Sequence, residues 1–369
     1  MSMTNGTDRK IRYAVVGGGW ISQAAFMPGV AQTGNSEITA LVTGDPEKAR
    51  VLGDRYGIRA WSYDAYREAL ASDTFDAVYL ALPNGMHRDY AVPTLEAGKH
   101  LLLEKPMATS VDEGEAIVAA ARAAGVKLMI AYRLHCEPGT LDAIERVRRG
   151  EIGEPLLFSS VFAQHVSGEN HRARQGYWAG PVPDMGTYPL NAVRNLFSSE
   201  PISVSAHGAR RPDSPFEFHG TVTVILRFPG ERMAQFTVSY ETDAVDEYRI
   251  VGTEGDLLMS PGFTFGRGLA GKLTTGGKMR DLSYAHVDQF SGETRYFSDC
   301  ILHDRAPEPD GEEGLADLRV LAAVERALET GETQVLPAME RSRRPSAGQG
   351  VALPPVKPPD LVDAAEPGG

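Results

Sequence analysis

A glycine-rich turn near the N-terminus is the first feature whose residue types indicate chemistry. It follows an apolar run at 11–16 that reads as a buried strand, it opens a short helix, and it has the sequence Gly17-Gly18-Gly19-Trp20-Ile21-Ser22. In this context Gly17 permits a tight turn, and Gly19 lets the backbone approach a pyrophosphate at the helix N-terminus. Small Ser22 allows the helix to pack closely on the strand. The turn predicts a dinucleotide site, and a glycine turn without a ligand is the alternative.

The end of the next expected strand, at 37–43, indicates which dinucleotide binds. An NAD site usually places a carboxylate there to hold the ribose hydroxyls, whereas this chain has Thr43 and Gly44, with Lys48 one turn into the following helix. A hydroxyl and an ammonium suit a 2′-phosphate, so the sequence predicts NADP. In the alternative, Asp45, which we expect to cap that helix, holds the ribose, and Lys48 is a solvated surface lysine.

Two further strand ends carry polar side chains. The run at 76–82 is followed by Pro83-Asn84-Gly85-Met86-His87, and the run at 100–103 is followed by Glu104-Lys105-Pro106. Ligands bind at the carboxyl ends of the strands in open α/β sheets, which makes Lys105 a candidate site residue. A surface lysine at a strand end is the alternative.

The order of the apolar runs divides the chain into two domains. Short apolar runs alternate with amphipathic stretches up to about residue 133, which is typical of a parallel sheet covered on both faces. Later runs, rich in β-branched and aromatic residues, indicate an antiparallel sheet; they span 155–165, 202–208, 218–228, 232–240 and 246–252. Helices are expected at 137–149 and 311–330.

We therefore expect an α/β protein with an NADP-binding Rossmann domain at 11–133. An α+β domain for substrate binding and oligomerisation, with a largely antiparallel open sheet, is expected at 134–335. The expected ends are a flexible N-terminus at 1–10 and a proline-rich flexible tail at 336–369 that cannot bury itself.

Together with the glycine loop and Leu82-Pro83-Asn84-Gly85-Met86-His87, four segments resemble the Gfo/Idh/MocA family of pyridine-nucleotide sugar oxidoreductases, and most closely its glucose-fructose and aldose-aldose oxidoreductase branch. They are Glu104-Lys105-Pro106, Met129-Ile130-Ala131-Tyr132-Arg133, Asp184-Met185-Gly186-Thr187-Tyr188-Pro189-Leu190-Asn191 and Gly311-Glu312-Glu313-Gly314. The resemblance covers about residues 10 to 335. It implies NADP, a sugar substrate, catalysis by Lys105 and Tyr188, and a sugar-holding role for Asp184. The segment Trp178-Ala179-Gly180-Pro181-Val182-Pro183 replaces a glycine triplet common in that branch, which leaves the identity of the sugar open.

The chemistry of these residues agrees with that implication. Removing hydride from the anomeric carbon of a cyclic sugar requires a base for the hydroxyl proton, and a free tyrosine with a pKa near ~10 is a poor base at neutral pH. The cation of Lys105 would assist Tyr188 as that base; an ordinary half-buried tyrosine is the alternative. Because Pro189 is expected at the first helical position, Asp184 and Tyr188 are expected in the turn that enters a helix, not on one helical face.

The resemblance also implies a wider set of contacts. Cofactor contacts are expected from the glycine loop with Trp20 and Ile21, from Thr43 and Lys48, and from Pro83, Asn84, His87, Glu104, Lys105 and Arg133. Substrate contacts are expected from Lys105, Arg133, Asp184, Tyr188, His165 and Arg172. Arg133 and His87 are equally well explained as structural partners, and His165 as a solvated loop residue.

Composition limits the partners. The 369 residues carry a formal net charge of −12, which argues against nucleic acid or an anionic membrane surface. The histidines show no paired spacing, and Cys136 and Cys300 form no Cys-x-x-Cys pair, so no metal is expected. No signal-peptide pattern and no apolar run of membrane-spanning length is seen, so we expect a cytoplasmic protein. By resemblance, a homodimer or homotetramer is expected through the C-terminal sheet.

These expectations combine into one predicted function. It is an NADP-dependent aldose oxidoreductase that transfers hydride between C1 of an aldopyranose and the nicotinamide and gives a lactone. Reduction of a second sugar on the same bound cofactor is a further option. The alternatives are a non-catalytic NADP-binding regulator and a dehydrogenase of another polyol or cyclic alcohol.

Overall fold

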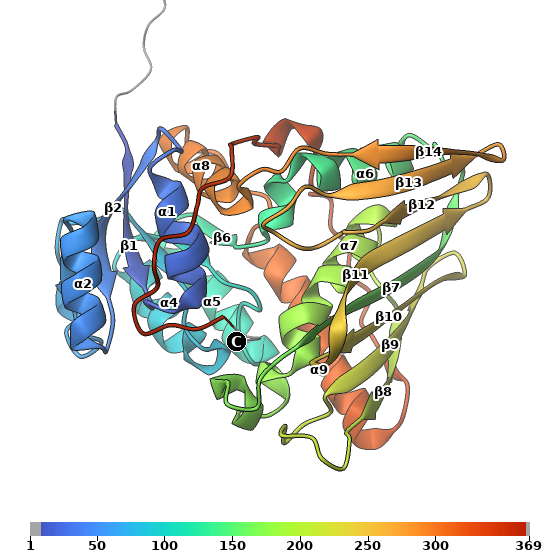
Figure 1. The fold of residues 1–369 in the computed structure, drawn as a ribbon, viewed down its shortest axis with the longest axis horizontal. Coiled ribbons are helices and arrows are strands. Elements are labelled where there is room, and N and C mark those ends of the chain that lie inside the picture. The colour runs from blue at the N-terminus through green and yellow to red at the C-terminus, as the bar shows by residue number, and fades with distance from the viewer. Residues whose placement is uncertain (1–8, 367–369) are drawn as a thin grey trace, which may run out of the picture.

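A six-stranded parallel sheet forms the N-terminal half of the protein, whose computed structural model describes residues 9–366 (Figure 1). Its strand order is β3-β2-β1-β4-β5-β6. The bounds are β1 Ile11–Val16, β2 Ser36–Val42, β3 Arg59–Trp61, β4 Ala77–Leu80, β5 His100–Leu103 and β6 Leu128–Ile130. This is the doubly wound order, in which the strand order reverses between β1 and β4 and ligands bind beyond the carboxyl ends of these two strands. The expected Rossmann domain is confirmed.

Helices cover the two faces of this sheet, and two of them begin at a capping side chain. The helices are α1 Met27–Val30, α2 Pro46–Tyr56, α3 Tyr66–Leu70, α4 His87–Glu96 and α5 Val111–Ala124. As expected, the Asp45 carboxylate accepts hydrogen bonds from the first backbone amides of α2. The Ser110 hydroxyl accepts one from the amide of Glu113 in α5. The capped start of α2 fixes where Lys48 lies.

Two helices from the C-terminal half complete the faces of the parallel sheet. α8 (Gln289–Leu302) packs beside α1, where the hydroxyls of Tyr13 and Ser298 lie 2.8 Å apart and Phe297 is fully buried (Figure 1). α9 (Gly311–Thr330) packs against α5 on the other face, and a Cβ at Gly114 would lie 2.6 Å from Leu318. Side chains from the two halves therefore pack in a shared hydrophobic core. This packing fixes the position of the parallel sheet relative to the second sheet.

The second sheet has nine strands in the order β14-β13-β12-β11-β7-β10-β9-β8-β15. The bounds are β7 Pro155–His165, β8 Ser203–Ala209, β9 Thr221–Phe228, β10 Arg232–Ser239, β11 Glu241–Gly252, β12 Gly255–Met259, β13 Ala270–Thr275, β14 Lys278–Ser283 and β15 Gln334–Val335. Only β7 and β10 pair in parallel, so the largely antiparallel sheet is confirmed.

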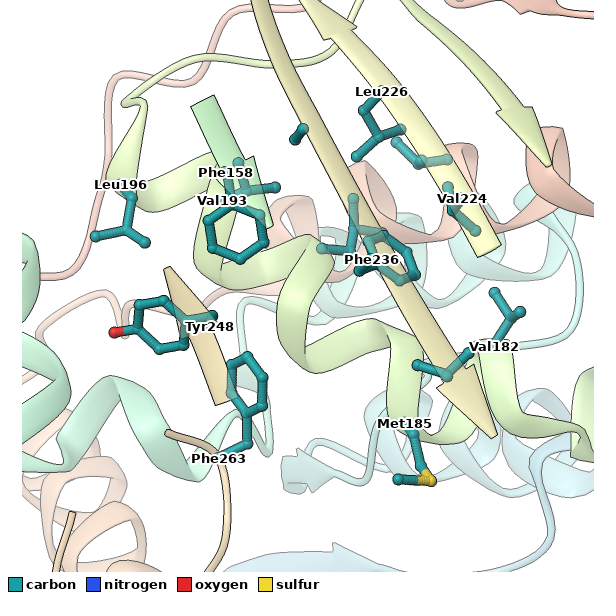
Figure 2. Close-up of a cluster of buried hydrophobic side chains, with 14 of the residues drawn as sticks. Phe158, Val182, Met185, Val193, Leu196, Val224, Leu226, Phe236, Tyr248 and Phe263 are labelled. Atoms are coloured by element: carbon teal, nitrogen blue, oxygen red, sulfur yellow. The ribbon is translucent and has the colours of Figure 1, made fainter. Parts of the chain in front are cut away.

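One face of the nine-stranded sheet packs on α6 (Pro138–Arg148) and α7 (Thr187–Leu196). Figure 2 shows side chains of the resulting core, among them Phe236 of β10, Val224 of β9 and Val193 of α7. The opposite face leaves Leu157 and Met233 exposed. An antiparallel sheet can pack against helices on one face and leave its other face open to solvent.

The expected flexible tail is corrected by the structure, which places residues 336–366 along the body of the protein. The Gln349 side chain is buried and donates to the Glu308 carbonyl, and the Val351 amide donates to the Cys136 carbonyl. The tail has few large apolar side chains of its own. Hydrogen bonds to groups on the body of the protein hold it in place instead of apolar packing. Of the expected flexible N-terminus, only Arg9 and Lys10 lie within the described residues. Between residues 9 and 366, no helix is long and apolar enough to cross a membrane.

A buried acid on α8 leads to a first prediction. Glu293 is fully buried, and within the described part of the chain neither of its carboxylate oxygens has a hydrogen-bond partner. Burial, with the nearby Glu104, raises the pKa of the Glu293 carboxyl well above its usual range. The folded protein then holds a proton that the unfolded chain releases above about pH 4.3, so stability falls as pH rises from there.

Glu293→Gln is expected to remove this pH dependence and to raise the free energy of unfolding at neutral pH by about 1–3 kcal/mol. Urea denaturation at several pH values between about 5 and 8 measures the effect. The exposed Glu332→Gln serves as control and should follow the wild type. A Glu293→Gln curve parallel to the wild-type curve would show that Glu293 does not titrate abnormally.

Candidate active site

The glycine loop has the geometry of a phosphate-binding turn. Gly17 has φ +101°, and a Cβ there would lie 2.3 Å from the Ala81 carbonyl oxygen, so the turn itself requires glycine. A Cβ on Gly19 would meet no atom of the described chain within 4 Å. The fold does not require glycine at that position, but a ligand approaching the backbone does. Ser22 donates a hydrogen bond of 2.6 Å to the Gly17 carbonyl and fixes the loop on the helix that follows.

Thr43 and Lys48 lie beside this loop, as predicted. A Cβ on Gly18 would be 3.6 Å from Lys48 Cδ and 3.7 Å from Thr43 Oγ1. Asp45 is occupied as the cap of α2, because its Oδ1 accepts from the amides of Glu47 and Lys48 at 2.8 and 3.1 Å. A hydroxyl and an ammonium thus flank the adenosine end of the crevice. Together with the glycine loop, these side chains fit a dinucleotide that carries an extra phosphate.

The loops after β4 and β5 are tied to their surroundings by polar contacts. Asn84 Nδ2 donates to the Trp178 carbonyl at 2.6 Å and links this loop to the second half, and Pro83 beside it is exposed. The Tyr79 hydroxyl donates to Glu104 Oε1 at 2.6 Å, and burial raises the pKa of the Glu104 carboxyl. We propose that Glu104 thereby supports the backbone at Lys105. The expected contact of Glu104 with the cofactor also remains a proposal.

His87 does not occupy the position expected for a cofactor contact. Its ring is fully buried, and its two nitrogens lie 2.9 Å from the carbonyl oxygens of Leu82 and Pro106. Both polar atoms of the ring are therefore engaged by the backbone of the two loops. The predicted cofactor contact is corrected to a structural role, because His87 holds the strand ends together.

Lys105 reaches across to the second half and pairs with Asp184. Its Nζ donates to the Asp184 carbonyl oxygen at 2.7 Å and to Asp184 Oδ1 at 2.9 Å. Burial lowers the pKa of the Lys105 ammonium, but the charge and hydrogen bond of Asp184, together with Tyr188 and Glu104, outweigh burial and leave the pKa raised. Lys105 therefore stays protonated at neutral pH. An ammonium has three N–H groups, so one remains for a ligand.

The Asp184 carboxylate is held by three side chains. Besides Lys105, Tyr240 donates to its Oδ2 at 2.7 Å, and Arg172 Nε lies 3.8 Å from the same oxygen. Burial raises the pKa of the Asp184 carboxyl, but Lys105 and Arg172 outweigh this and hold it well below its usual range. Asp184 is thus an ionised, immobilised acceptor. The structure brings Arg172 to this site as predicted, whereas the sequence analysis did not single out Tyr240.

Tyr188 packs between cations and aromatic rings. Lys105 Nζ and Arg133 Cζ each lie 4.9 Å from the centre of its ring, and Phe162 packs edge-on at 5.5 Å. Tyr188 also lines a pocket with Tyr248 and other side chains. Lys105 lies over the ring and does not bond the hydroxyl in the described structure, so its effect on Tyr188 is electrostatic.

The helix that carries Tyr188 starts earlier than expected. A π-helical turn, η6 (Val182–Gly186), runs directly into α7, so Asp184 and Tyr188 lie on one continuous helical segment. The expectation that Pro189 begins the helix is wrong. Pro189 has no N–H to donate back into the irregular turn, and the Asp184 carbonyl accepts from Lys105. A proline three residues inside a helix is tolerated here because the turn before it is wide.

Two further predicted contacts differ in outcome. Arg133 lies at the site, yet its guanidinium is buried and donates to the Gln289 side chain and, at 2.8 Å, to the Phe263 carbonyl. It anchors the loop that carries Phe263. His165 is exposed at the end of β7, and strand alternation places its side chain on the face opposite that of Phe162. The predicted substrate contact of His165 is therefore corrected.

Three residues at the site were missed by sequence reasoning. Tyr240 follows directly after β10, and its place at a strand end was the available signal. Phe162 lies on the inward face of a strand whose bounds were predicted, so the alternation of that strand could have identified it. Phe263 falls in a segment for which no element was predicted and gave no signal.

Comparison with known proteins agrees with this geometry. Two family models match, one for an oxidoreductase family with an NAD-binding Rossmann fold at residues 11–132 and one for the GFO/IDH/MocA C-terminal domain at residues 140–258. The chain belongs to the Gfo/Idh/MocA oxidoreductase family. The resemblance predicted from the sequence is confirmed.

Among the family's members, D-xylose 1-dehydrogenase [NADP(+)] of Haloarcula marismortui is 34% identical over 339 residues, which cover 89% of this chain and 93% of that protein. The aldose-aldose oxidoreductase of Caulobacter crescentus superposes with a TM-score of 0.84 at 33% identity, over 89% of this chain and 100% of that chain. A 3-ketoreductase from Actinomadura kijaniata, solved with NADP, superposes with a TM-score of 0.80 at 25% identity over 87% of this chain and 98% of that chain.

Proposed function

We propose that this protein oxidises an aldopyranose at C1 to the lactone with NADP as hydride acceptor, and that a second sugar re-oxidises the bound cofactor. Its relatives are NADP-dependent D-xylose 1-dehydrogenases and an aldose-aldose oxidoreductase, so the protein is an NADP-dependent oxidoreductase that acts on CH–OH groups of sugars. The observation that carries the finer proposal is the contact of Lys105 with Asp184 beside the ring of Tyr188.

Each residue of this group has a distinct task in the proposed reaction. Bound NADP supplies the acceptor for the hydride that leaves the sugar carbon. The ionised Asp184 accepts hydrogen bonds from sugar hydroxyls with the lone pairs that Lys105 and Tyr240 leave free. In its phenolate form Tyr188 takes the hydroxyl proton and becomes the phenol, and the remaining N–H of Lys105 stabilises the alkoxide character of the sugar oxygen.

A regulator that binds NADP without catalysis is the rival class, because a fold can retain its cofactor site and lose its chemistry. A regulator would not need a buried ammonium paired with a buried carboxylate beside a tyrosine, and such a group is costly unless it is used. The cluster therefore favours the enzyme. A polyol or another cyclic alcohol as substrate is the second alternative.

The absorbance spectrum of the purified protein tests the proposal, before and after addition of glucose, xylose and other aldoses. A reduced-nicotinamide band that forms with an aldose, with a lactone as product, supports oxidation at C1. Its loss on addition of a second sugar supports the coupled reduction. No band with any aldose, but one with inositol or another polyol, would transfer the proposal to that substrate.

Self-association through the nine-stranded sheet is also part of the proposal. The face opposite α6 and α7 exposes Leu157 and Met233, and a second copy of the chain would remove these apolar side chains from water.

Lys48→Ala is expected to weaken NADP binding by about 10- to 100-fold, the loss of one charge-assisted contact worth roughly 1.5–3 kcal/mol. NAD has no 2′-phosphate, so its affinity should be unchanged. Titration of both cofactors by intrinsic fluorescence measures the difference. Arg50→Ala removes the same charge from the exposed side of α2 and is the matched control. Equal binding of NAD and NADP by the wild type would contradict the phosphate site.

A further inference from the structure

The last described part of the chain crosses from the second half onto the dinucleotide domain. The Leu353 carbonyl accepts from the amide of Asp288 at 2.9 Å, at the start of α8. Further along, the Asp360 carbonyl accepts from Arg55 Nη1 of α2 at 2.8 Å. In Figure 1 this red segment runs beside α1. The tail thus follows a path that ends next to the glycine loop.

A buried glutamine holds the end of this path. Gln23 lies in the helical turn after the glycine loop and is 1% exposed. Its Nε2 donates to the Gly18 carbonyl at 2.8 Å and to the Val362 carbonyl at 2.9 Å, and its Oε1 accepts from the Val362 amide at 2.7 Å. One side chain therefore joins the phosphate-binding loop to both backbone groups of Val362. These hydrogen bonds fix the tail at this position.

Asp363, the residue after Val362, places a negative charge near Lys48. Asp363 Oδ2 lies 3.7 Å from Lys48 Nζ, and Asp45 Oδ2 lies 4.0 Å from the same nitrogen. Asp45 is committed as the cap of α2, whereas Asp363 belongs to a segment without regular structure. The side chain of Asp363 is 78% exposed, and that of Lys48 is 16% exposed. The cation that faces the phosphate site is thus already beside a carboxylate of the same chain.

We propose that Asp363 competes with the 2′-phosphate of NADP for Lys48, so that the C-terminal tail sets the affinity for NADP and its preference over NAD. This inference rests on the proposed role of Lys48. Two anions at one cation repel each other, so the phosphate binds only if Asp363 moves away or shares the ammonium. The 2′-hydroxyl of NAD carries no charge and meets no such penalty. Because Asp363 is exposed, water and salt limit the effect to a few-fold.

Isothermal titration of the full-length protein tests the competition with four probes. NADP and adenosine 2′,5′-bisphosphate carry the 2′-phosphate, and NAD and 5′-AMP lack it. Asp363→Asn is expected to bind the first two about 2- to 5-fold more tightly than the wild type at low salt and to leave the other two unchanged. The gain should shrink as salt is added. Asp360→Asn makes the same charge change three residues away and should match the wild type.

A double-mutant cycle with Lys48→Ala separates this inference from the proposed function. In the Lys48→Ala background, Asp363→Asn should have no effect. If Lys48→Ala weakens NADP binding while Asp363→Asn equals the wild type or binds NADP more weakly, the competition is wrong and the phosphate site stands. Equal gains in NADP affinity from Asp363→Asn and Asp360→Asn would indicate a general charge effect and would overturn the proposed competition. If Lys48→Ala leaves NADP binding unchanged, both proposals fail.

Discussion

Tyr188→Phe is expected to lower kcat for sugar oxidation by about 10²- to 10⁴-fold, the usual contribution of one acid-base group, with NADP affinity unchanged. The substitution deletes only the hydroxyl. The ring keeps its edge-on contact with Phe162 and its place between Lys105 and Arg133, so the fold of the site is preserved. Because proton transfer occurs in the transition state, the loss should fall on kcat more than on KM.

Tyr248→Phe is the matched control for this experiment. Tyr248 lines the same pocket and packs against Phe263, but it has no proposed role in proton transfer. Steady-state rates of both variants with the best aldose from the spectral screen give the comparison, and fluorescence titration checks cofactor binding. Near-normal turnover of Tyr188→Phe would remove the phenol from the mechanism. Equal losses in both variants would instead indicate disturbed packing of the pocket.

The architecture could be predicted from local sequence signals wherever these were strong. The runs at 100–103 and 155–165 and the helix at 311–330 coincide with β5, β7 and α9. Apolar runs specify the buried strands, and α9 has an acceptor at its start, Asp310, and Gly331 in the left-handed conformation at its end. Elements without such signals were missed. β14 is largely exposed, so its sequence lacks the alternation of a half-buried strand.

The order of the tail could not be predicted, because it depends on partners that are distant in the sequence. Composition correctly indicated that the tail has no core of its own, but Gln23 and Cys136 supply fixed hydrogen-bonding groups for Val362 and Val351. No local pattern encodes these contacts. The same holds for Glu293, whose isolation follows from the packing of α8 on the parallel sheet.

The candidate site shows the same limit. Sequence reasoning selected Lys105, Asp184 and Tyr188 individually, and they remain proposals as catalytic residues. The pairing of Lys105 with Asp184 joins positions that are 79 residues apart on different domains. Tyr240, which also donates to Asp184, is 56 residues from it in the sequence. Only the three-dimensional contact shows that the ammonium is committed to the carboxylate and lies over the ring of Tyr188, not at its hydroxyl.

This pairing leads to the last prediction, in which Lys105→Ala lowers kcat by at least about 10²-fold and also changes the pH profile. The lysine holds the pKa of the Asp184 carboxyl well below its usual range, so wild-type Asp184 stays ionised from about pH 5 upward. Without Lys105, burial raises that pKa, and only Arg172 and Tyr240 remain to oppose the effect of burial. Asp184 in the variant then takes up a proton as pH falls, and residual activity should decline at a higher pH than in the wild type.

Lys105→Arg separates the charge of this residue from its geometry. A guanidinium keeps a positive charge beside Asp184, so the acid side of the profile should stay as in the wild type, while kcat falls because its planar fork cannot reproduce the placement of the ammonium. The measurement is kcat/KM from about pH 5 to about pH 9 for the wild type, Lys105→Ala and Lys105→Arg. Three profiles with the same acid limb would show that Lys105 does not control Asp184, and wild-type kcat in Lys105→Ala would exclude the lysine from the reaction. An acid limb that moves upward only in the alanine variant would instead show that Lys105 serves the reaction in two ways, through its own N–H and through the ionised state of Asp184.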